Sequence, residues 1–486
     1  MKNQQALLLC DFYKLAHRRL YPKDTELIYS TFTPRDSRIS GVTSVVSFGQ
    51  QAFIKEYLIN YFTENFFNVP KEKIVSDYKR FITATLGTKE PETAHIEELH
   101  DLGYLPLEIK SIPEGMSVPI RVPVMTIQNT HPNFFWLTNY IETLISCELW
   151  KTMTSATIAK QYYNMLENYA MQTGGSEQFV PFQGHDFSMR GMSSLKSAIN
   201  SGMGHLVYFT GTDTIPAICA MEEYYNADIT KELVGTSIPA TEHSIQCSYQ
   251  DDYNYFKEII TNVHPTGFVS IVSDGYDFWN VVGNILPQLK NDIMNRDGRV
   301  VIRPDSGDPV KIVCGDSEAN TKIEQDGLIS TLWDIFGGTI NAKGYKELDS
   351  HIGAIYGDSI TLERARSISE KLKEKGFATT NIVYGIGSYT YQHNTRDTFG
   401  FAMKSTLAVI NGDEKQIFKN PKTDNGIKKS QKGKVVVKYD EEGEIQYYEG
   451  YSLNYNDPQD LLTTIYKDGK LVKETTLQKI RGLARQ

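Results

Sequence analysis

One short apolar run is followed at once by an arginine and an aspartate, two side chains that could bind a substrate or take part in catalysis. Residues 300–302 are Val-Val-Ile, three β-branched residues that favour a short buried strand. Arg303 and Asp305 come directly after it, where Pro304 and Gly307 turn the chain. An arginine can hold an anion, and an aspartate can bind sugar hydroxyls or a metal-bound water. An ion pair that merely closes a strand end fits the motif equally well.

The same arrangement recurs along the middle of the chain, which favours the chemical interpretation. Short apolar runs, each followed by polar residues and then by a helical pattern, occupy 179–182, 206–209, 236–239, 268–272, 300–302, 352–355 and 382–384. About seven strand–helix units, spaced roughly 30 residues apart, predict a (β/α) barrel. An open doubly wound sheet gives the same local signals, although its usual Gly-x-Gly-x-x-Gly after the first strand is missing. The longer interval between 309 and 352 predicts an insertion.

The ends of these predicted strands offer several kinds of reactive group. They comprise carboxylates, cations and two histidines, namely Asp186, Asp213, Asp274, Asp305, Asp358, Arg190, Arg303, Arg396, Lys404, His185 and His243. Gly385, Gly387 and Ser388 follow the last strand, where barrel enzymes commonly bind a phosphate through backbone N–H groups. Phe187 could stack on a flat ring, although a single phenylalanine is more often part of the core. Together these groups predict an enzyme that handles a phosphosugar or a nucleotide.

The remainder of the chain is rich in β-formers and turns. The predicted fold class is α/β, a (β/α) barrel with a discontinuous, mainly antiparallel β domain and extra helices. Residues 1–150 are expected to form the N-terminal β and helical part of the flanking domain, and residues 151–400 the barrel. Residues 401–486 should add hairpins to the flanking domain, with turns at 411–413, 440–444 and 467–470.

Composition excludes several classes of protein. The chain has 486 residues, of which 40% are hydrophobic and 22% charged, as in ordinary globular proteins of two or three domains. A net charge of -9 argues against binding nucleic acid. Its five cysteines show no metal-binding spacing, which predicts reduced thiols and a cytoplasmic location. The apolar run at 6–9 is too short for a signal peptide or a membrane span.

The strand-end residues occur within a longer ordered set of motifs. These are Asp11-Phe12-Tyr13-Lys14, His185-Asp186-Phe187-Ser188-Met189-Arg190-Gly191, Gly211-Thr212-Asp213-Thr214, Thr241-Glu242-His243, Ser273-Asp274, Arg303-Pro304-Asp305, Gly357-Asp358 and Thr395-Arg396-Asp397. With this set the chain resembles the nicotinamide phosphoribosyltransferase family over nearly its whole length. The resemblance implies transfer of phosphoribosyl from phosphoribosyl pyrophosphate to nicotinamide, giving nicotinamide mononucleotide and pyrophosphate in NAD salvage. It also implies Mg²⁺, coupled hydrolysis of ATP through a phosphohistidine, and a homodimer with shared active sites.

The resemblance further assigns roles to residues of this chain. Phe187 and the partner subunit's Tyr13 would sandwich the pyridine ring, and Asp213 would accept a hydrogen bond from the carboxamide. His243, oriented by Glu242, would be the phosphohistidine. Asp305 would help to order Mg²⁺, which is expected to be held mainly by pyrophosphate and water. The other implied substrate-binding residues are Asp11, Arg190, Ser273, Arg303, Gly357, Asp358, Gly387, Ser388, Arg396, Lys404 and Lys429.

Departures from the family pattern and alternative functions remain open. Ser388 replaces a glycine, and Gly353 stands where animal members carry an arginine. A nicotinate phosphoribosyltransferase is the nearest alternative, and Asp213 argues against it because a carboxylate repels nicotinate. A catalytically silent, secreted or partner-binding member is a second alternative, against which the intact His243, Arg303 and Asp305 argue. An unrelated phosphosugar barrel would require the ordered motifs to be a coincidence.

Overall fold

The chain divides into two compact units. The computed structural model describes residues 4–419 and 429–486. The first unit comprises Met1–Thr157, Ala220–Ala227 and Asn394–Gln486, and the second comprises Ile158–Cys219 and Asp228–His393. Among the described residues, none of the helices combines the length and the apolar character that crossing a membrane requires.

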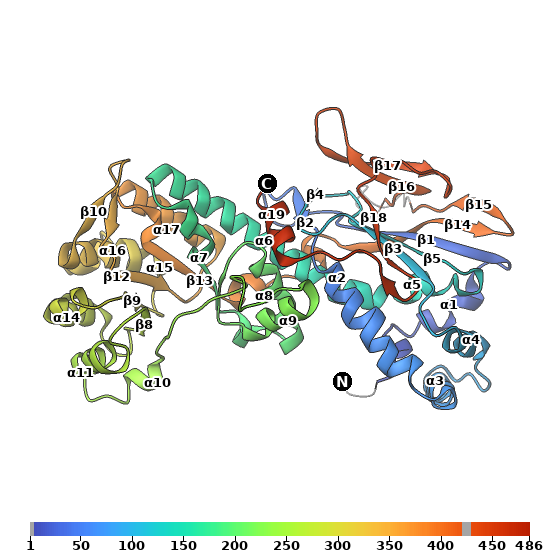
Figure 1. Cartoon of the computed structure of the whole chain (residues 1–486), viewed down its shortest axis with the longest axis horizontal. Helices are drawn as coiled ribbons and strands as arrows, with labels where there is room; N and C mark the ends of the chain where they lie inside the picture. Colours follow the sequence, from blue (N-terminus) through green and yellow to red (C-terminus); the bar gives the residue numbers. More distant parts are fainter. Residues whose placement is uncertain (1–3, 420–428) are drawn as a thin grey trace. The chain divides into compact units, whose positions relative to one another are not determined.

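The second unit is organised around a curled parallel sheet of six strands in the order β7-β6-β13-β12-β9-β8 (Figure 1). The strands are β6 (Gly184–Asp186), β7 (Gly211–Thr212), β8 (Val269–Val272), β9 (Val300–Arg303), β12 (Ile352–Tyr356) and β13 (Ile382–Ile386). All neighbouring strands are parallel, and β6 pairs with β13, the first strand with the last. This closing pair curls the sheet into a half-barrel, which distinguishes it from an open doubly wound sheet.

An extended segment joins the two edges of the half-barrel. The N–H of Thr212 in β7 donates to the carbonyl of Thr236 over 2.9 Å. At the other edge, Ser270 in β8 donates to the carbonyl of Pro239 over 2.8 Å and accepts from the N–H of Thr241 over 3.0 Å. The apolar run at 236–239 is therefore paired with both edge strands, although only through isolated bridges.

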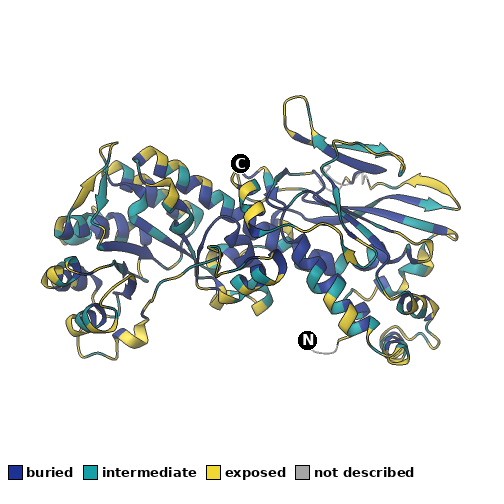
Figure 2. Ribbon diagram, in the orientation of Figure 1, coloured by how far each residue is buried: buried dark blue, intermediate teal, exposed yellow. Residues whose placement is uncertain are grey.

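Helices surround this sheet and bury the outer face of its strands. They are α7 (Val180–Gln183), α8 (Leu195–Leu206), α10 (His243–Gln246), α11 (Asp252–Glu258), α12 (Phe278–Asn280), α13 (Leu286–Gln288), α14 (Lys290–Met294), α15 (Pro309–Cys314), α16 (Lys322–Phe336), α17 (Leu362–Glu374) and α18 (Ser388–Tyr391), while α6 (Glu142–Thr173) and α9 (Ile215–Tyr225) contribute residues to both units. Helix α17 illustrates the packing, because Ala365, Ile368 and Leu372 are buried on one face while its lysines remain outside. Figure 2 shows the resulting pattern of buried strands and helices with exposed outer faces. The hairpin of β10 (Gly338–Ile340) and β11 (Lys346–Leu348), together with α16, occupies the predicted insertion.

Two of the predicted strands are wrong. Residues 179–182 lie in a 3-10 turn and in α7, and Pro181 stands in the first turn of α7, where proline is favoured. The strand begins at Gly184 instead. Residues 206–209 complete α8 and the turn after it, and β7 follows at Gly211. Both runs are apolar because they are buried, and a short buried run gives the same signal in a helix as in a strand.

The first unit contains a seven-stranded antiparallel sheet built from both ends of the chain. Its order is β15-β14-β1-β5-β3-β18-β19. The strands are β1 (Thr25–Thr33), β3 (Leu107–Ser111), β5 (Met125–Asn129), β14 (Ala402–Ile410), β15 (Asp413–Gln416), β18 (Thr463–Lys467) and β19 (Lys470–Leu471). Because β14 pairs with β1 and β18 with β3, the discontinuous antiparallel part of the predicted fold class is confirmed.

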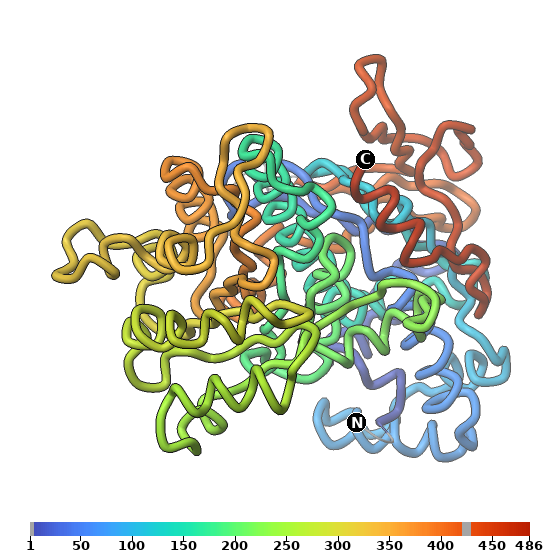
Figure 3. Tube along the Cα trace, turned by 60° about the vertical axis from the view of Figure 1, so that its left-hand side comes forward, coloured from blue at the N-terminus to red at the C-terminus, as the bar shows by residue number. Residues whose placement is uncertain are grey.

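The predicted hairpins of the C-terminal region are present. Asn411 and Gly412 join β14 and β15 with φ angles of 52° and 78°, as a tight hairpin turn requires. The hairpin of β16 (Lys434–Tyr439) and β17 (Ile445–Tyr451) projects from the first unit (Figure 1 and Figure 3). The unit is completed by β2 (Ser44–Val46), β4 (Ser117–Pro119), α1 (Lys14–Leu20), α2 (Gln50–Phe53), α3 (Lys71–Leu86), α4 (Ala94–Leu102), α5 (Leu137–Tyr140) and α19 (Leu477–Ala484).

Candidate active site

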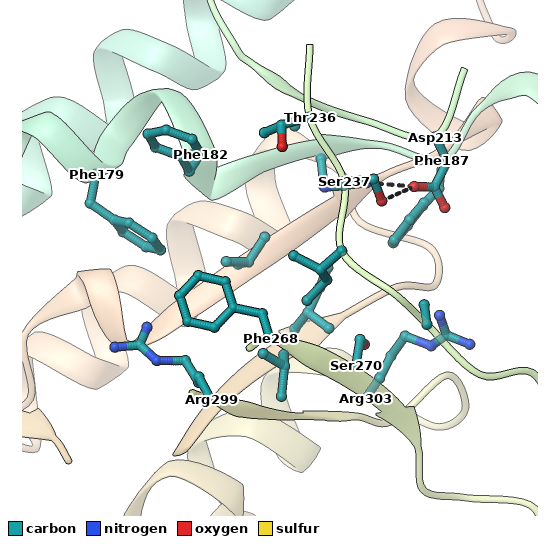
Figure 4. Close-up of a pocket in the computed structure, with 17 residues that line it drawn as sticks. Phe179, Phe182, Phe187, Asp213, Thr236, Ser237, Phe268, Ser270, Arg299 and Arg303 are labelled. Carbon is teal, nitrogen blue, oxygen red and sulfur yellow. Dashed lines mark hydrogen bonds and ion pairs between the residues drawn. The ribbon is translucent and has the colours of Figure 1, made fainter. Parts of the chain in front are cut away.

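A cavity of about 170 Å³ lies within the curled sheet of the second unit. Its lining comes from the sheet, from the 236–240 segment and from the turn before β6. Figure 4 shows Asp213 and Ser237 close to Phe187 on one side, and Phe179 and Phe182 farther away. A second cavity, of about 560 Å³, shares Phe187, Asp213 and Arg303 with the first and extends along the carboxyl ends of the strands. These ends are where barrel enzymes place their chemistry.

Asp213 follows β7 and is held as an ionised acceptor. Its Oδ1 accepts a hydrogen bond from the hydroxyl of Ser237 over 2.6 Å and lies 2.9 Å from Nε2 of His185. Burial alone would raise the pKa of this carboxyl, but the hydrogen bonds from His185 and Ser237 and the charge of Arg303 lower the pKa below its usual value. No hydrogen bond to Oδ2 occurs within the described residues. Oδ2 is therefore the oxygen that remains for a ligand in the cavity.

Phe187 lies beside this carboxylate, and two glycines leave room for its ring and for the neighbouring Asp305 carboxylate. A Cβ atom at Gly385 would approach the Phe187 ring to 2.6 Å, and one at Gly357 would stand 2.5 Å from Oδ1 of Asp305. The ring centroid of Phe187 is 4.6 Å from that of His185. A planar aromatic ligand in the cavity would thus have an aromatic face and an anionic acceptor within reach.

Asp274, which follows β8, connects three groups at the neighbouring strand ends. Its Oδ2 accepts from the backbone N–H of Asp305 over 2.9 Å and from the hydroxyl of Ser306 over 2.6 Å. Its Oδ1 lies 3.1 Å from Nε2 of His243. Asp274 thereby fixes both the turn after β9 and the orientation of the His243 ring.

Arg303 and Asp305 face the larger cavity from the end of β9. The guanidinium of Arg303 donates from Nη2 to the carbonyl of Thr241 over 2.6 Å, and its buried Nε has no hydrogen-bond partner among the described residues. Burial raises the pKa of Asp305, the charges of Arg303 and His243 lower it, and the charges of Asp274 and Asp358 raise it further, with a net rise. A cation near Asp305 would be attracted to this group of carboxylates.

The late glycine turn also lines the larger cavity. Gly387 precedes α18, and Arg190 stands opposite in the 3-10 turn Met189–Gly191. A Cβ atom at Gly191 would lie 2.0 Å from the hydroxyl oxygen of Ser388, so the two turns are closely packed. The predicted residues Arg190, Gly387 and Ser388 are thus brought together with Arg303, Asp305, Gly357 and Asp358.

Five predicted residues lie in the first unit. Lys404 and Lys429 line a cavity of about 140 Å³ together with Arg35, Arg121 and Glu449, an arrangement suited to an anion. Arg396 is exposed and pairs with Asp397 over 3.4 Å. Tyr13 is 58% exposed, and Asp11 accepts a hydrogen bond from the hydroxyl of Thr143 over 2.8 Å.

The structure assigns different contacts to two predicted residues. Glu242 accepts a hydrogen bond from Ser244, and the side chain that contacts His243 is Asp274. Ser273 is buried, and its hydroxyl donates to the carbonyl of Ile271 over 2.7 Å.

Three residues contribute to the site although the family resemblance assigns them no role, namely Asp274, His185 and Ser237. Asp274 and His185 were both recognised as strand-end groups, and neighbouring side chains at a strand end point to opposite sides. That alternation is a signal that distinguishes Asp274 from Ser273. Ser237 has no comparable signal, because it lies in a segment without regular pairing.

The larger cavity is lined by carboxylates, which are common ligands of Mg²⁺. Among the described residues, no group of three or more histidine, cysteine, aspartate or glutamate side chains is arranged to hold a metal ion. Asp305 and Asp358 nevertheless line this cavity, and, besides burial, the charges of Asp274 and Asp358 raise the pKa of Asp305. This arrangement fits a Mg²⁺ ion that is held mainly by substrate oxygens and water.

Comparison with known proteins places this site in a family. The model of the nicotinate phosphoribosyltransferase (NAPRTase) family matches residues 182–470, and that of the nicotinamide phosphoribosyltransferase N-terminal domain matches residues 5–109. A nicotinamide phosphoribosyltransferase of Acinetobacter baylyi is 49% identical over 485 residues, covering 97% of this chain and 95% of the relative. One of Mycoplasma pneumoniae is 37% identical over 86% of this chain and 92% of the relative.

Solved structures support the same fold. Nicotinate-nucleotide pyrophosphorylase from Pyrococcus furiosus matches with a TM-score of 0.59 at 14% identity, covering 99% of this chain and 94% of that chain. Human nicotinic acid phosphoribosyltransferase matches with a TM-score of 0.52 at 13% identity, covering 99% and 92%. At such low identity these two structures establish the fold alone. By the sequence matches, this chain belongs to the nicotinamide phosphoribosyltransferase family of pentosyl-transferring enzymes.

Proposed function

We propose that the protein transfers the phosphoribosyl group of phosphoribosyl pyrophosphate to nicotinamide, forming nicotinamide mononucleotide and pyrophosphate. The observation that carries the proposal is the ionised Asp213 beside Phe187 in a cavity within the half-barrel. Its Oδ2 can accept a hydrogen bond from the carboxamide N–H₂ of nicotinamide. The same carboxylate repels the acid group of nicotinate, so it favours the amide.

The residues around the larger cavity supply positioning and charge. The unprotonated ring nitrogen attacks C1 of the ribose while the bond from C1 to pyrophosphate breaks, so no general base is required. Arg303 and Arg190 neutralise phosphate oxygens, and Gly387 and Ser388 offer backbone N–H groups to the 5′-phosphate. Asp305 and Asp358 line this cavity and would hold the ribose hydroxyls and water molecules bound to Mg²⁺. When bound, Mg²⁺ would stabilise negative charge on the pyrophosphate leaving group.

We infer further that ATP hydrolysis is coupled through His243. Its ring is half-exposed, and Nε2 contacts Asp274, which leaves Nδ1 without a hydrogen bond among the described residues. When Nε2 carries the proton that is shared with Asp274, Nδ1 presents a lone pair to the γ-phosphorus of ATP. The bond from Pγ to ADP breaks as the N–P bond forms, and water later hydrolyses the phosphohistidine to phosphate.

The proposal includes a homodimer with shared active sites. The exposed aromatic ring of Tyr13 and the cations Lys404 and Lys429 lie in the first unit, whereas Phe187 and Asp213 lie in the second. A mixing experiment tests sharing, because a heterodimer of Tyr13→Ala and Asp213→Asn subunits has one doubly impaired site and one intact site. Recovery of activity on mixing would support sharing between subunits, and the absence of recovery in a verified heterodimer would contradict it.

The reaction itself is tested by its products. Purified protein is incubated with phosphoribosyl pyrophosphate, Mg²⁺ and either nicotinamide or nicotinate, and the mononucleotide and pyrophosphate are quantified. We expect equimolar nicotinamide mononucleotide and pyrophosphate, with higher yield when ATP is added. Efficient use of nicotinate alone would identify a nicotinate phosphoribosyltransferase. A folded protein that forms neither product would overturn the enzymatic proposal in favour of a silent binding protein.

A further inference from the structure

The acceptor that selects the pyridine substrate is one member of a pair of titratable groups. His185 in β6 places Nε2 2.9 Å from Oδ1 of Asp213 after β7. The two residues stand side by side because His185 pairs in register with Gly211. A Cβ atom at Gly211 would come within 2.8 Å of His185 Nδ1, so the glycine makes room for the histidine ring. The side chain of His185 is 12% exposed, whereas that of Asp213 is 47% exposed.

We propose that the charge of His185 sets the discrimination between nicotinamide and nicotinate, so that the preference for nicotinamide weakens when His185 is protonated. The inference rests on the proposed function and extends it from Asp213 to the pair. With neutral His185 the pair carries one negative charge, which repels the carboxylate of nicotinate. With protonated His185 the pair is neutral overall, and this repulsion is largely cancelled. The carboxamide of nicotinamide carries no charge and is affected much less.

The geometry separates the two oxygens of Asp213 in a way that this mechanism requires. His185 and Ser237 both contact Oδ1, so Oδ2 is left to face the ligand whichever charge the histidine carries. The acceptor for the carboxamide therefore persists while the charge behind it changes. Histidine is the side chain that ordinarily changes charge between about pH 5 and pH 8.

The other charged or titratable groups near His185 do not explain a pH-dependent change of charge beside Asp213. Burial lowers the pKa of His205 to about 4, so His205 is neutral over the range of interest. Asp186, adjacent in β6, is buried and accepts hydrogen bonds from the N–H of Ser188 over 2.9 Å and from the hydroxyl of Thr214 over 2.8 Å. Arginine side chains in general do not lose their charge over such a range. His185 is thus the histidine that contacts Asp213 directly.

The test is the ratio of kcat/KM for nicotinamide to kcat/KM for nicotinate between about pH 5.5 and pH 8.5, which spans the ordinary titration of histidine. Groups that act on phosphoribosyl pyrophosphate or ATP, including His243, change kcat/KM for both pyridines by the same factor. Their pH dependence therefore cancels in the ratio. We expect the ratio to fall by roughly tenfold or more from high to low pH, following one titration. In His185→Gln, whose amide can donate to Asp213 but cannot be protonated, the ratio should be independent of pH.

Ser237→Ala is the matched control, because it removes the other donor to Oδ1 and leaves His185 in place. Its ratio should still depend on pH. A purely structural role of His185 would change the size of the ratio in His185→Gln but not its pH dependence. A flat ratio in the unmodified protein, or the same pH dependence in His185→Gln, would overturn the inference while leaving the proposed function intact. Failure to bind or convert either pyridine would overturn both, and calorimetric titration with each pyridine detects that case.

Discussion

Replacing Asp213 with asparagine changes the acceptor of the site with little change in shape. If the amide oxygen takes the place of Oδ1, the hydrogen bonds from His185 and Ser237 at 2.9 Å and 2.6 Å are kept. The amide N–H₂ then replaces Oδ2 and faces the carboxamide N–H₂ of nicotinamide, so two donors meet. Loss of a hydrogen bond to a charged group costs about 1.5–3 kcal/mol.

Nicotinate should gain from the same substitution. Two unit charges about 4 Å apart repel by about 1 kcal/mol in water and about 4 kcal/mol near a protein surface. The side chain of Asp213 is 47% exposed, so an intermediate value of about 2 kcal/mol is appropriate. Added to the loss for nicotinamide, the total of about 3.5–5 kcal/mol shifts the nicotinamide to nicotinate ratio by roughly 400- to 5,000-fold.

The assay is steady-state kcat/KM for each pyridine at about pH 8, where an ordinary histidine is neutral, with phosphoribosyl pyrophosphate and Mg²⁺ saturating. The KM for phosphoribosyl pyrophosphate serves as an internal control, because the substituted side chain would lie on the pyridine side of the site and should leave this KM nearly unchanged. A ratio that stays within about threefold of the unmodified protein would refute the role assigned to Asp213. A loss of both activities together with a lower melting temperature would indicate misfolding. In that case the affinities of the folded fraction for nicotinate and nicotinamide decide whether Asp213 discriminates between them.

Three further predictions concern other parts of the structure. His243→Ala should abolish ATP hydrolysis and acid-labile phosphorylation but retain ATP-independent synthesis; a variant that still hydrolyses ATP would exclude His243 as the acceptor. Gly357→Ala should push the carboxylate of Asp305, 2.5 Å from the new Cβ, and lower kcat/KM for phosphoribosyl pyrophosphate by about 100-fold, whereas Gly482→Ala, in open space, should have no effect. Burial raises the pKa of Glu114 to about 7, so the wild type should lose about 3 kcal/mol of unfolding free energy relative to Glu114→Gln as the pH rises from about 4.5 to 7. A difference in urea unfolding that stays constant over this range would contradict the last prediction.

The half-barrel could be predicted where its strands are rich in β-branched residues and end at turn residues. Strands β8 and β9 follow this pattern, and they begin within one residue of the expected runs. The first strands could not be located in this way, because β6 and β7 contain glycine, histidine and threonine and are only three and two residues long. The apolar run at 179–182 lies in a 3-10 turn and α7, and the run at 206–209 lies at the end of α8 and in the turn after it. Their burial gives the same signal as a strand.

In the site, too, residues that belong to a local sequence pattern could be predicted, whereas contacts between distant segments could not. Residues of the strand-end motifs, such as Arg303, Asp305 and Gly357, line one cavity, since parallel strands bring their carboxyl ends to one edge. The partner of His243 could not be deduced from the sequence alone. Glu242 is its neighbour along the chain, but backbone geometry directs that side chain toward Ser244, and Asp274 approaches from the next strand.

We propose that this chain transfers phosphoribosyl to nicotinamide and selects nicotinamide through the ionised carboxylate of Asp213. A competition assay tests it most directly: the protein receives phosphoribosyl pyrophosphate, Mg²⁺ and equal concentrations of nicotinamide and nicotinate at about pH 8, and the two mononucleotides are separated and quantified. Nicotinamide mononucleotide should be the dominant product. Nicotinate mononucleotide as the main product, or equal amounts of both, would contradict the proposal.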